Sequence, residues 1–248
     1  MTYLCVPIFV RTLDQTRHDL SAAVEAGAEM IELRLDTLSD ARLLPQIIEA
    51  ARTCRLTWIA TCRPIAEGGH SAKSDEARFD LLLQAGRSAS YVDWELATPG
   101  PAPRLQEISK VILSSHDFSG RPERLYNLLL EMDKSACEVR KIAWKARTIR
   151  DNAEAFEILQ QAQKPTIALC MGEAGAISRI LAKKFGAFLT FASLQNESAT
   201  APGQISIADM KGIYRWDKIK RGTKVYGVVA NPVGHSMSPA IHNAAFEA

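Results

Sequence analysis

A short apolar run followed by a segment with helical spacing of apolar residues recurs eight times, and this repeat constrains the fold more than any other feature of the chain. The runs are predicted to be strands at 4–9, 30–35, 57–62, 91–96, 111–115, 139–144, 166–170 and 188–191. The segments after them are predicted to be helices at 14–25, 41–53, 76–88, 104–110, 123–134, 151–161, 176–185 and 207–215. Parallel strands need crossover helices, so the repeat fits a closed (β/α)8 barrel, the TIM-barrel fold, better than an open doubly wound sheet.

Charged residues share one face of two predicted strands. Because strand side chains alternate between faces, Glu32, Arg34 and Asp36 are expected to point into the barrel, and so are Asp93 and Glu95. These charges either contact a ligand or form an ion-pair network that sets the register of the barrel. The sequence leaves both interpretations open.

A lysine within one predicted strand and a histidine at the end of another predict covalent catalysis on a ketone. Lys141 shares a strand face with the small Ala143, and His116 follows the run at 111–115. Taken alone, they are ordinarily a solvated lysine and a core histidine. An exposed lysine, with a pKa of about 10.4, is protonated at neutral pH, so a nucleophilic lysine must be buried or lie near positive charge. Catalytic residues of such barrels lie at the C-terminal ends of strands, which favours a catalytic His116.

Composition and charge indicate a small-molecule partner. A formal net charge of +2 with scattered lysines and arginines gives no basic stripe for a nucleic acid. We expect no membrane partner and a cytoplasmic location, because no apolar stretch approaches the roughly 20 residues that span a bilayer and no signal core is present. The five cysteines contain no CxxC pair, which argues against a disulfide framework and a zinc site.

Six motifs, in order along residues 4 to 216, resemble those of type I 3-dehydroquinate dehydratase. They are Glu32-Leu33-Arg34, Cys62-Arg63 followed by Glu67-Gly68-Gly69, Ser115-His116-Asp117-Phe118, Lys141-Ile142-Ala143, Ile177-Ser178-Arg179 and Ala201-Pro202-Gly203-Gln204. The resemblance implies a (β/α)8 barrel that uses no cofactor. It also implies conversion of 3-dehydroquinate to 3-dehydroshikimate in the shikimate pathway, through an imine on a lysine.

The resemblance also implies a role for each matching residue. Lys141 would form the Schiff base, His116 would act as the general base and acid, and Glu67 would orient the imidazole. The residues expected to bind the substrate are Glu32, Arg34, Arg63, Arg179, Thr200 and Gln204. Arg179 suits the substrate carboxylate, because a planar guanidinium grips a carboxylate through two parallel hydrogen bonds. Thr200 stands where the family commonly carries serine, so the hydroxyl is retained.

The C-terminal tail resembles the opening of shikimate dehydrogenase, with a predicted strand at 225–229 before the stretch Asn231 to Pro239. The resemblance divides the chain into a barrel at 1–217, a linker at 218–223 and a truncated start of a substrate-binding domain at 224–248. Ser236 and Ser238 would contact shikimate in the intact second domain. The sequence contains no GxGxxG motif, so NADP is expected only for the missing dehydrogenase part.

Two other functions stay open. Schiff-base aldolases use the same barrel and the same imine, although they usually bind sugar phosphates and no phosphate-binding loop is evident here. A catalytically silent barrel that serves as a scaffold for the dehydrogenase is the alternative outside enzyme chemistry. The oligomeric state is also open between a monomer and a homodimer, because free-standing members of the family often pair and fused ones can act as monomers.

Overall fold

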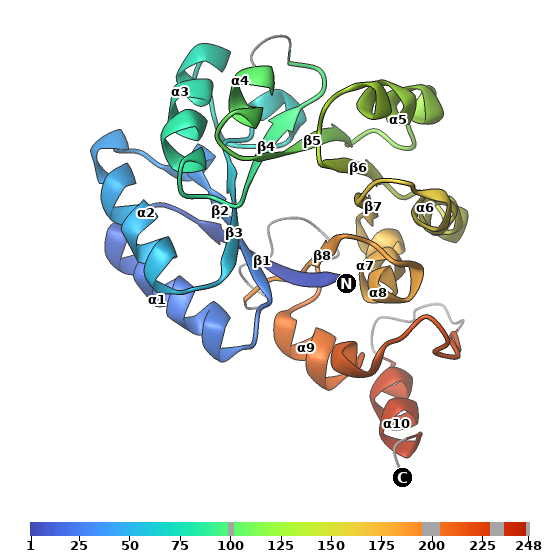
Figure 1. The fold of residues 1–248 in the computed structure, drawn as a ribbon. Coiled ribbons are helices and arrows are strands. Elements are labelled where there is room, and N and C mark those ends of the chain that lie inside the picture. Colours follow the sequence, from blue (N-terminus) through green and yellow to red (C-terminus); the bar gives the residue numbers. More distant parts are fainter. Residues whose placement is uncertain (99–101, 195–203, 229–235, 247–248) are drawn as a thin grey trace.

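Eight parallel strands, with helices between them, form a nearly closed barrel in the computed structural model (Figure 1). The structure describes residues 1–98, 102–194, 204–228 and 236–246. The strands are β1 (Tyr3–Phe9), β2 (Met30–Arg34), β3 (Thr57–Thr61), β4 (Tyr91–Glu95), β5 (Lys110–Asp117), β6 (Val139–Lys145), β7 (Thr166–Met171) and β8 (Leu189–Phe191). The α-helices are α1 (Leu13–Glu25), α2 (Leu44–Thr53), α3 (Asp75–Gly86), α4 (Ala102–Gln106), α5 (Leu125–Lys134), α6 (Ile149–Gln161), α7 (Ala176–Ile180), α8 (Ala182–Phe185), α9 (Ile207–Gly212) and α10 (Ser238–Ala245). Short 3-10 helices are η1 (Leu35–Thr37), η2 (Ala41–Leu43), η3 (Ile65–Glu67), η4 (Glu173–Gly175) and η6 (Trp216–Lys218).

The order of the strands confirms the predicted (β/α)8 barrel. Neighbouring strands run β7-β6-β5-β4-β3-β2-β1-β8, and every ladder is parallel. A backbone hydrogen bond from Phe188 N to Thr166 O, 2.8 Å long, links the two ends of this order. Each strand is followed by helix, so each crossover returns the chain to the same end of the barrel (Figure 1).

The strand side chains alternate between the lumen and the surrounding helices, as the sequence predicts. Apolar residues of the outward faces pack against the helices in two large clusters. A third cluster fills the lumen with buried side chains from every strand except β4: Cys5, Met30, Ile59, Ile112, Val139, Ala143, Ile167, Leu169, Met171, Leu189 and Phe191. Tyr3, Tyr91 and Phe188 pack against this cluster, and the ring centroids of Tyr3 and Tyr91 lie 5.6 and 5.3 Å from that of Phe188 in edge-on contacts. The lumen is therefore packed and apolar where the strands begin.

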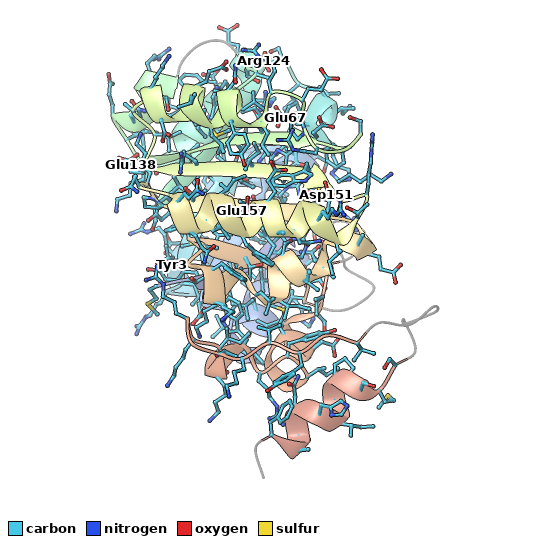
Figure 2. All side chains as sticks on the ribbon, turned by 90° about the vertical axis from the view of Figure 1, so that its right-hand side faces the viewer. Tyr3, Glu67, Arg124, Glu138, Asp151 and Glu157 are labelled. Carbon is cyan, nitrogen blue, oxygen red and sulfur yellow. The ribbon has the colours of Figure 1, made fainter. Side chains whose placement is uncertain are left out.

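The polar residues of the lumen lie toward the opposite end, where the strands finish. In Figure 2, Tyr3 and Glu138 mark the end at which the strands begin, and Glu67 and Asp151 mark the other end. Loops that follow the strands meet at this C-terminal end, which is where barrel enzymes build their active sites.

Several predicted helices differ from the observed ones at their ends, and two of them differ most. The helix predicted at 176–185 is divided into α7 and α8, because Leu181 has φ −93° and ψ 4°, outside the helical region. The helix predicted at 104–110 ends at Gln106, since β5 begins at Lys110 and the chain needs residues to turn between them. Both differences lie on the outside of the barrel.

Two predicted strands also differ. The strand predicted at 111–115 continues to Asp117, so His116 lies inside β5 and is held by a ladder to β6. The strand predicted at 225–229 is wrong for its described part, because 225–228 has no regular structure. A strand is held by backbone hydrogen bonds to a neighbour, and among the described residues no strand runs beside this segment.

Candidate active site

A cavity of about 100 Å³ opens at the C-terminal end of the barrel. Its described lining residues are Glu32, Arg34, Arg63, Glu67, Gly68, His116, Phe118, Lys141, Ala143, Leu169, Met171, Arg179 and Phe191. The structure thus brings all three predicted catalytic residues and four of the predicted substrate-binding residues around one cavity. They come from β2, β5 and β6 and from the segments after β3 and β7.

Lys141 projects from β6 and is only 5% exposed. Its Nζ lies 2.8 Å from Asp93 Oδ2 and 3.6 Å from Glu32 Oε1. The amine also lies 4.9 Å from the centre of the Phe191 ring. The small side chain of Ala143, one position along the same face, lines the cavity next to it. The amine is therefore fixed by buried carboxylates and an aromatic face, in a place that a ligand can reach.

Asp93 connects this lysine to other buried charges. Its Oδ1 accepts hydrogen bonds from Ser114 Oγ at 2.6 Å and Arg63 Nη2 at 2.7 Å, and its Oδ2 accepts one from Lys141. Burial alone would raise the pKa of Asp93, but the positive charges of Arg63 and Lys141 hold it well below its usual range. Asp93 therefore stays ionised and keeps Lys141 and Arg63 in place.

The ion-pair network extends outward from Arg63 to α3. Arg63 Nη1 lies 2.7 Å from Glu95 Oε1, and Glu95 Oε2 is bound by Arg78. Arg78 is completely buried, donates to the carbonyl of Cys62 at 2.8 Å and lies 5.1 Å from the centre of the Trp94 ring. Of the two interpretations of Asp93 and Glu95, the structure supports the ion-pair network.

His116 and Glu67 form a second, partly buried pair, with 2.9 Å between His116 Nδ1 and Glu67 Oε2. Glu67 ends η3, and the chain turns directly after it through Gly68 at φ +74°, a conformation that favours glycine. Burial raises the pKa of Glu67 to about 7, although Arg63 opposes this. Burial, Arg63 and Lys141 together lower the pKa of His116 well below the ordinary histidine value. At neutral pH the imidazole is therefore uncharged and can act as a base.

Two arginines line the cavity, and they differ in whether a carboxylate holds the guanidinium. Arg34 donates to both oxygens of Asp36, at 2.9 and 2.8 Å, so its guanidinium is held by a parallel pair of hydrogen bonds. Arg179 of α7 is only 4% exposed, and among the described residues it forms no ion pair and its Nε has no partner. Burial lowers the pKa of Arg179 to about 10. A buried cation without an acidic partner at a cavity favours binding of an anion there.

The remaining predicted residues lie elsewhere. Thr200 lies outside the described residues. Gln204 is described and half-buried, but it is not among the described residues that line the cavity. Ser236 and Ser238 lie at the start of α10 in the tail, where Ser236 Oγ accepts a hydrogen bond from Ser238 N at 3.2 Å.

Sequence reasoning missed Arg78 and Ser114. Ser114 lies two positions before His116 on the same strand face, and this period-two spacing was a usable signal. Arg78 offered none, because an arginine in an amphipathic helix is normally solvated.

No cluster of three or more histidine, cysteine, aspartate or glutamate side chains able to hold a metal occurs within the described ranges. In the same part of the chain, no helix is long and apolar enough to cross a membrane.

The fold and the site define a class: (β/α)8 barrels with a buried lysine and a histidine–carboxylate pair at one cavity. Comparison with known proteins narrows this class. The family described as type I 3-dehydroquinase matches residues 4–221, and the chain belongs to this family. A curated relative, the 3-dehydroquinate dehydratase of Desulfotalea psychrophila, is 32% identical over 85% of this chain and 96% of its own length.

Another relative is longer than this chain. The bifunctional 3-dehydroquinate dehydratase/shikimate dehydrogenase of Arabidopsis thaliana is 37% identical over 98% of this chain, which spans 42% of the length of that relative. Among solved structures, the 3-dehydroquinate dehydratase of Aquifex aeolicus has a TM-score of 0.75 at 30% identity and covers 88% of this chain and 99% of its own. The dehydroquinate dehydratase and shikimate dehydrogenase of S. pombe shares the fold, with a TM-score of 0.72 at 24% identity, over 99% of this chain and 50% of its own.

Proposed function

We propose that this chain dehydrates 3-dehydroquinate to 3-dehydroshikimate through a Schiff base on Lys141, without a cofactor. The observation that carries the proposal is that a buried lysine faces the same small cavity as a histidine–glutamate pair and an arginine that has no acidic partner among the described residues. Membership of the type I 3-dehydroquinase family supports the choice of substrate. The reaction places the chain in the shikimate pathway.

In the proposed reaction, the Lys141 ammonium first passes a proton to His116, and the neutral amine attacks the ketone carbon. The same proton then leaves with the hydroxyl of the carbinolamine as water, which gives an iminium. The cationic nitrogen withdraws electrons from the adjacent carbon and makes a proton of that carbon removable. The free Nε2 of His116 takes this proton while Nδ1–H donates to the ionised Glu67. The resulting enamine expels the hydroxyl, which leaves as water with the proton that His116 returns. Water then hydrolyses the imine and releases the conjugated product and the free lysine.

The other polar groups of the cavity are proposed to bind the substrate. Arg179 would hold its carboxylate through two parallel hydrogen bonds, as its lack of an acidic partner among the described residues suggests. Glu32, Arg34 and Arg63 would bind the hydroxyls. From the sequence resemblance, Thr200 and Gln204 would close over the substrate and exclude water from the imine.

We further propose that the chain is the dehydratase part of a bifunctional enzyme. The proposed parts are a dehydratase barrel at 1–217, a linker at 218–223 and the start of a shikimate dehydrogenase at 224–248. Alignment of 98% of the chain with 42% of the bifunctional relative supports a longer whole protein, and the boundaries come from the sequence resemblance. Reduction of 3-dehydroshikimate with NADP, and any contact of Ser236 and Ser238 with shikimate, would belong to the whole protein.

Absorbance with 3-dehydroquinate and no added cofactor tests the dehydratase proposal, because the conjugated product absorbs where the substrate does not. We expect the native chain to generate the signal and Lys141→Ala to generate none. The matched control is Lys145→Ala, which removes an exposed lysine from the same strand and should leave turnover unchanged. Borohydride with substrate should add a permanent mass to the native chain and to Lys145→Ala only.

Unchanged turnover in Lys141→Ala would reject the imine mechanism. No signal from the folded native chain would favour a scaffold or a different ketone substrate, such as that of an aldolase.

A further inference from the structure

We propose that His70 is a positioning residue for the reaction: it holds the guanidinium of Arg34 against the substrate by completing the hydrogen bonds of Asp36. The inference rests on the proposed function only for what Arg34 binds. His70 follows Glu67-Gly68-Gly69 in the loop between β3 and α3, and it does not line the cavity itself.

Asp36 is a fully buried carboxylate whose hydrogen bonds come from two residues. Arg34 donates to it twice, at 2.9 and 2.8 Å. His70 also donates twice, from its backbone N at 3.1 Å and its ring Nδ1 at 3.3 Å, both to Oδ2. An ionised carboxylate only accepts, so Nδ1 must carry the proton. Burial alone would raise the pKa of Asp36, but the hydrogen bonds and charge of Arg34 and the hydrogen bonds of His70 lower it. Asp36 therefore stays ionised and pairs with Arg34.

The same two residues also share an aromatic ring. The guanidinium of Arg34 lies 5.5 Å from the centre of the Phe9 ring, and the imidazole of His70 meets this ring edge-on at 5.7 Å. Asp36 has no exposed side-chain area, whereas the side chain of His70 is 59% exposed. His70 therefore lies between solvent and the two groups that fix Arg34, the carboxylate and the aromatic face.

The position of His70 is fixed by the fold of its loop, residues 64–71. A backbone hydrogen bond from Ser71 N to Arg63 O, 3.1 Å long, joins the end of the loop to its start. Glu67 of the same loop holds the catalytic imidazole at 2.9 Å. One compact loop thus supports the acid–base pair at one point and the guanidinium at another.

Loss of the His70 ring removes one hydrogen bond from Asp36 and opens this carboxylate to water. Arg34 then gains alternative orientations that must be lost again when substrate binds. Binding should weaken more than the chemical step, because the Schiff-base lysine and the acid–base pair keep their own partners. We expect His70→Ala to raise KM for 3-dehydroquinate about threefold to tenfold, the usual net contribution of one hydrogen bond that is partly exposed to water, with kcat within about twofold.

Two further variants separate the hydrogen bond from the packing. His70→Asn restores an N–H donor on Cγ, where Nδ1 is attached in histidine, and should recover most of the native KM. His70→Phe restores a ring beside Phe9 without a donor and should resemble His70→Ala. His18→Ala removes an exposed histidine from α1 and is the matched control, with native KM.

A double-mutant cycle tests whether His70 acts through Arg34. In an Arg34→Lys background, His70→Ala should raise KM by less than about 1.5-fold, because coupled residues are non-additive. Full additivity of the two effects would overturn the proposal. A native KM in His70→Ala, or rescue by Phe and not by Asn, would overturn it as well.

Solvent exchange at the side chain of Arg34 tests the role of His70 independently of turnover. The Nε–H signal of Arg34, assigned by NMR with Arg34→Lys, should exchange with solvent faster in His70→Ala and His70→Phe than in the native chain and His70→Asn. This pattern in a protein that does not turn over 3-dehydroquinate would reject the dehydratase and support the positioning role. Equal exchange in all four proteins, with normal turnover, would reject the positioning role alone.

Discussion

At the scale of single residues, the His116–Glu67 pair determines the form of the base. The useful form has a proton on His116 Nδ1, an ionised Glu67 and a free Nε2. If the pair takes up one more proton, Nε2 can no longer accept, whether the proton lies on the imidazole or on the carboxyl. Burial raises the pKa of Glu67 to about 7, so we expect this uptake near neutral pH. Activity should therefore fall as pH drops through about 7.

Glu67→Gln should move this fall to lower pH. Glutamine accepts the hydrogen bond of Nδ1 but does not titrate, which leaves His116, whose pKa is held well below the ordinary value by burial, Arg63 and Lys141. We expect the acid limb of kcat/KM to shift toward lower pH. With the imidazole less well oriented, kcat should fall about 10- to 100-fold.

The pH profile of kcat/KM for both proteins measures this shift. Glu76→Gln, which changes an exposed glutamate of α3, is the control and should keep the native profile. An acid limb at the same pH in Glu67→Gln would assign the titration to another group.

Some residues of the site were predictable from the sequence, and others were not. Lys141 and His116 were predictable because lysine and histidine are conspicuous on strand faces. The bond between Asp36 and His70 was not, because it joins η1, directly after β2, to a loop 34 residues later and depends on how that loop closes. Arg78 was hidden for a similar reason: its partner Glu95 lies on another element.

At the scale of secondary-structure elements, the strands of the barrel were the most predictable part. Each is buried on both faces, so each reads as a short apolar run. The helix ends were less predictable, as the division at Leu181 shows, because they depend on how each helix meets the neighbouring loop. The strand predicted at 225–229 failed in its described part because a strand depends on a partner that its own sequence does not reveal.

The packing of β3, β4 and α3 should depend on Glu95 of β4, because its carboxylate binds the buried guanidiniums of Arg63 and Arg78. Glu95→Ala leaves Arg63 and Arg78 each short of one buried carboxylate. We expect a loss of about 3–5 kcal/mol in the free energy of unfolding, the usual cost of breaking a buried ion pair from one side. Urea denaturation of both proteins measures the loss.

Glu131→Ala is the matched control, because Glu131 pairs with Arg124 at 3.6 Å while both side chains are at least half exposed. Its loss should stay within about 1 kcal/mol. Similar small losses in both variants would show that water or the remaining partners replace Glu95.

At the scale of the whole molecule, the segment that follows the proposed barrel stays in contact with it. Trp216 is fully buried and Ile219 is 6% exposed, and both belong to the core cluster between strands and helices. Lys184 Nζ then donates to the carbonyls of Arg221 and Thr223, at 2.9 and 2.8 Å. The segment predicted as a linker at 218–223 is thus attached to the barrel.

The tail after Thr223 contacts the barrel much less. Asn243 Nδ2 donates to Ile213 O at 2.8 Å, and several large apolar side chains of the tail are exposed: Val225, Tyr226, Val228, Met237, Ile241 and Phe246. Such a surface is typical of a segment that packs against something larger or associates with other copies. The proposed second domain would cover this surface.

Removal of residues 224–248 should therefore leave the dehydratase intact. We expect kcat/KM within about twofold of the native value and less aggregation at high concentration, because the exposed apolar side chains are gone.

Removal of residues 214–248 is the contrasting truncation, because it also removes Trp216. The Nε1 of Trp216 lies 3.4 Å from Glu29 Oε2, and its ring lies 5.2 Å from Lys183 Nζ. This cut should cost at least about 3–5 kcal/mol of stability, the cost of losing a buried tryptophan. Thermal unfolding, activity and light scattering of the two shortened chains measure these effects, and a loss of turnover after the shorter cut would place part of the tail in the dehydratase itself.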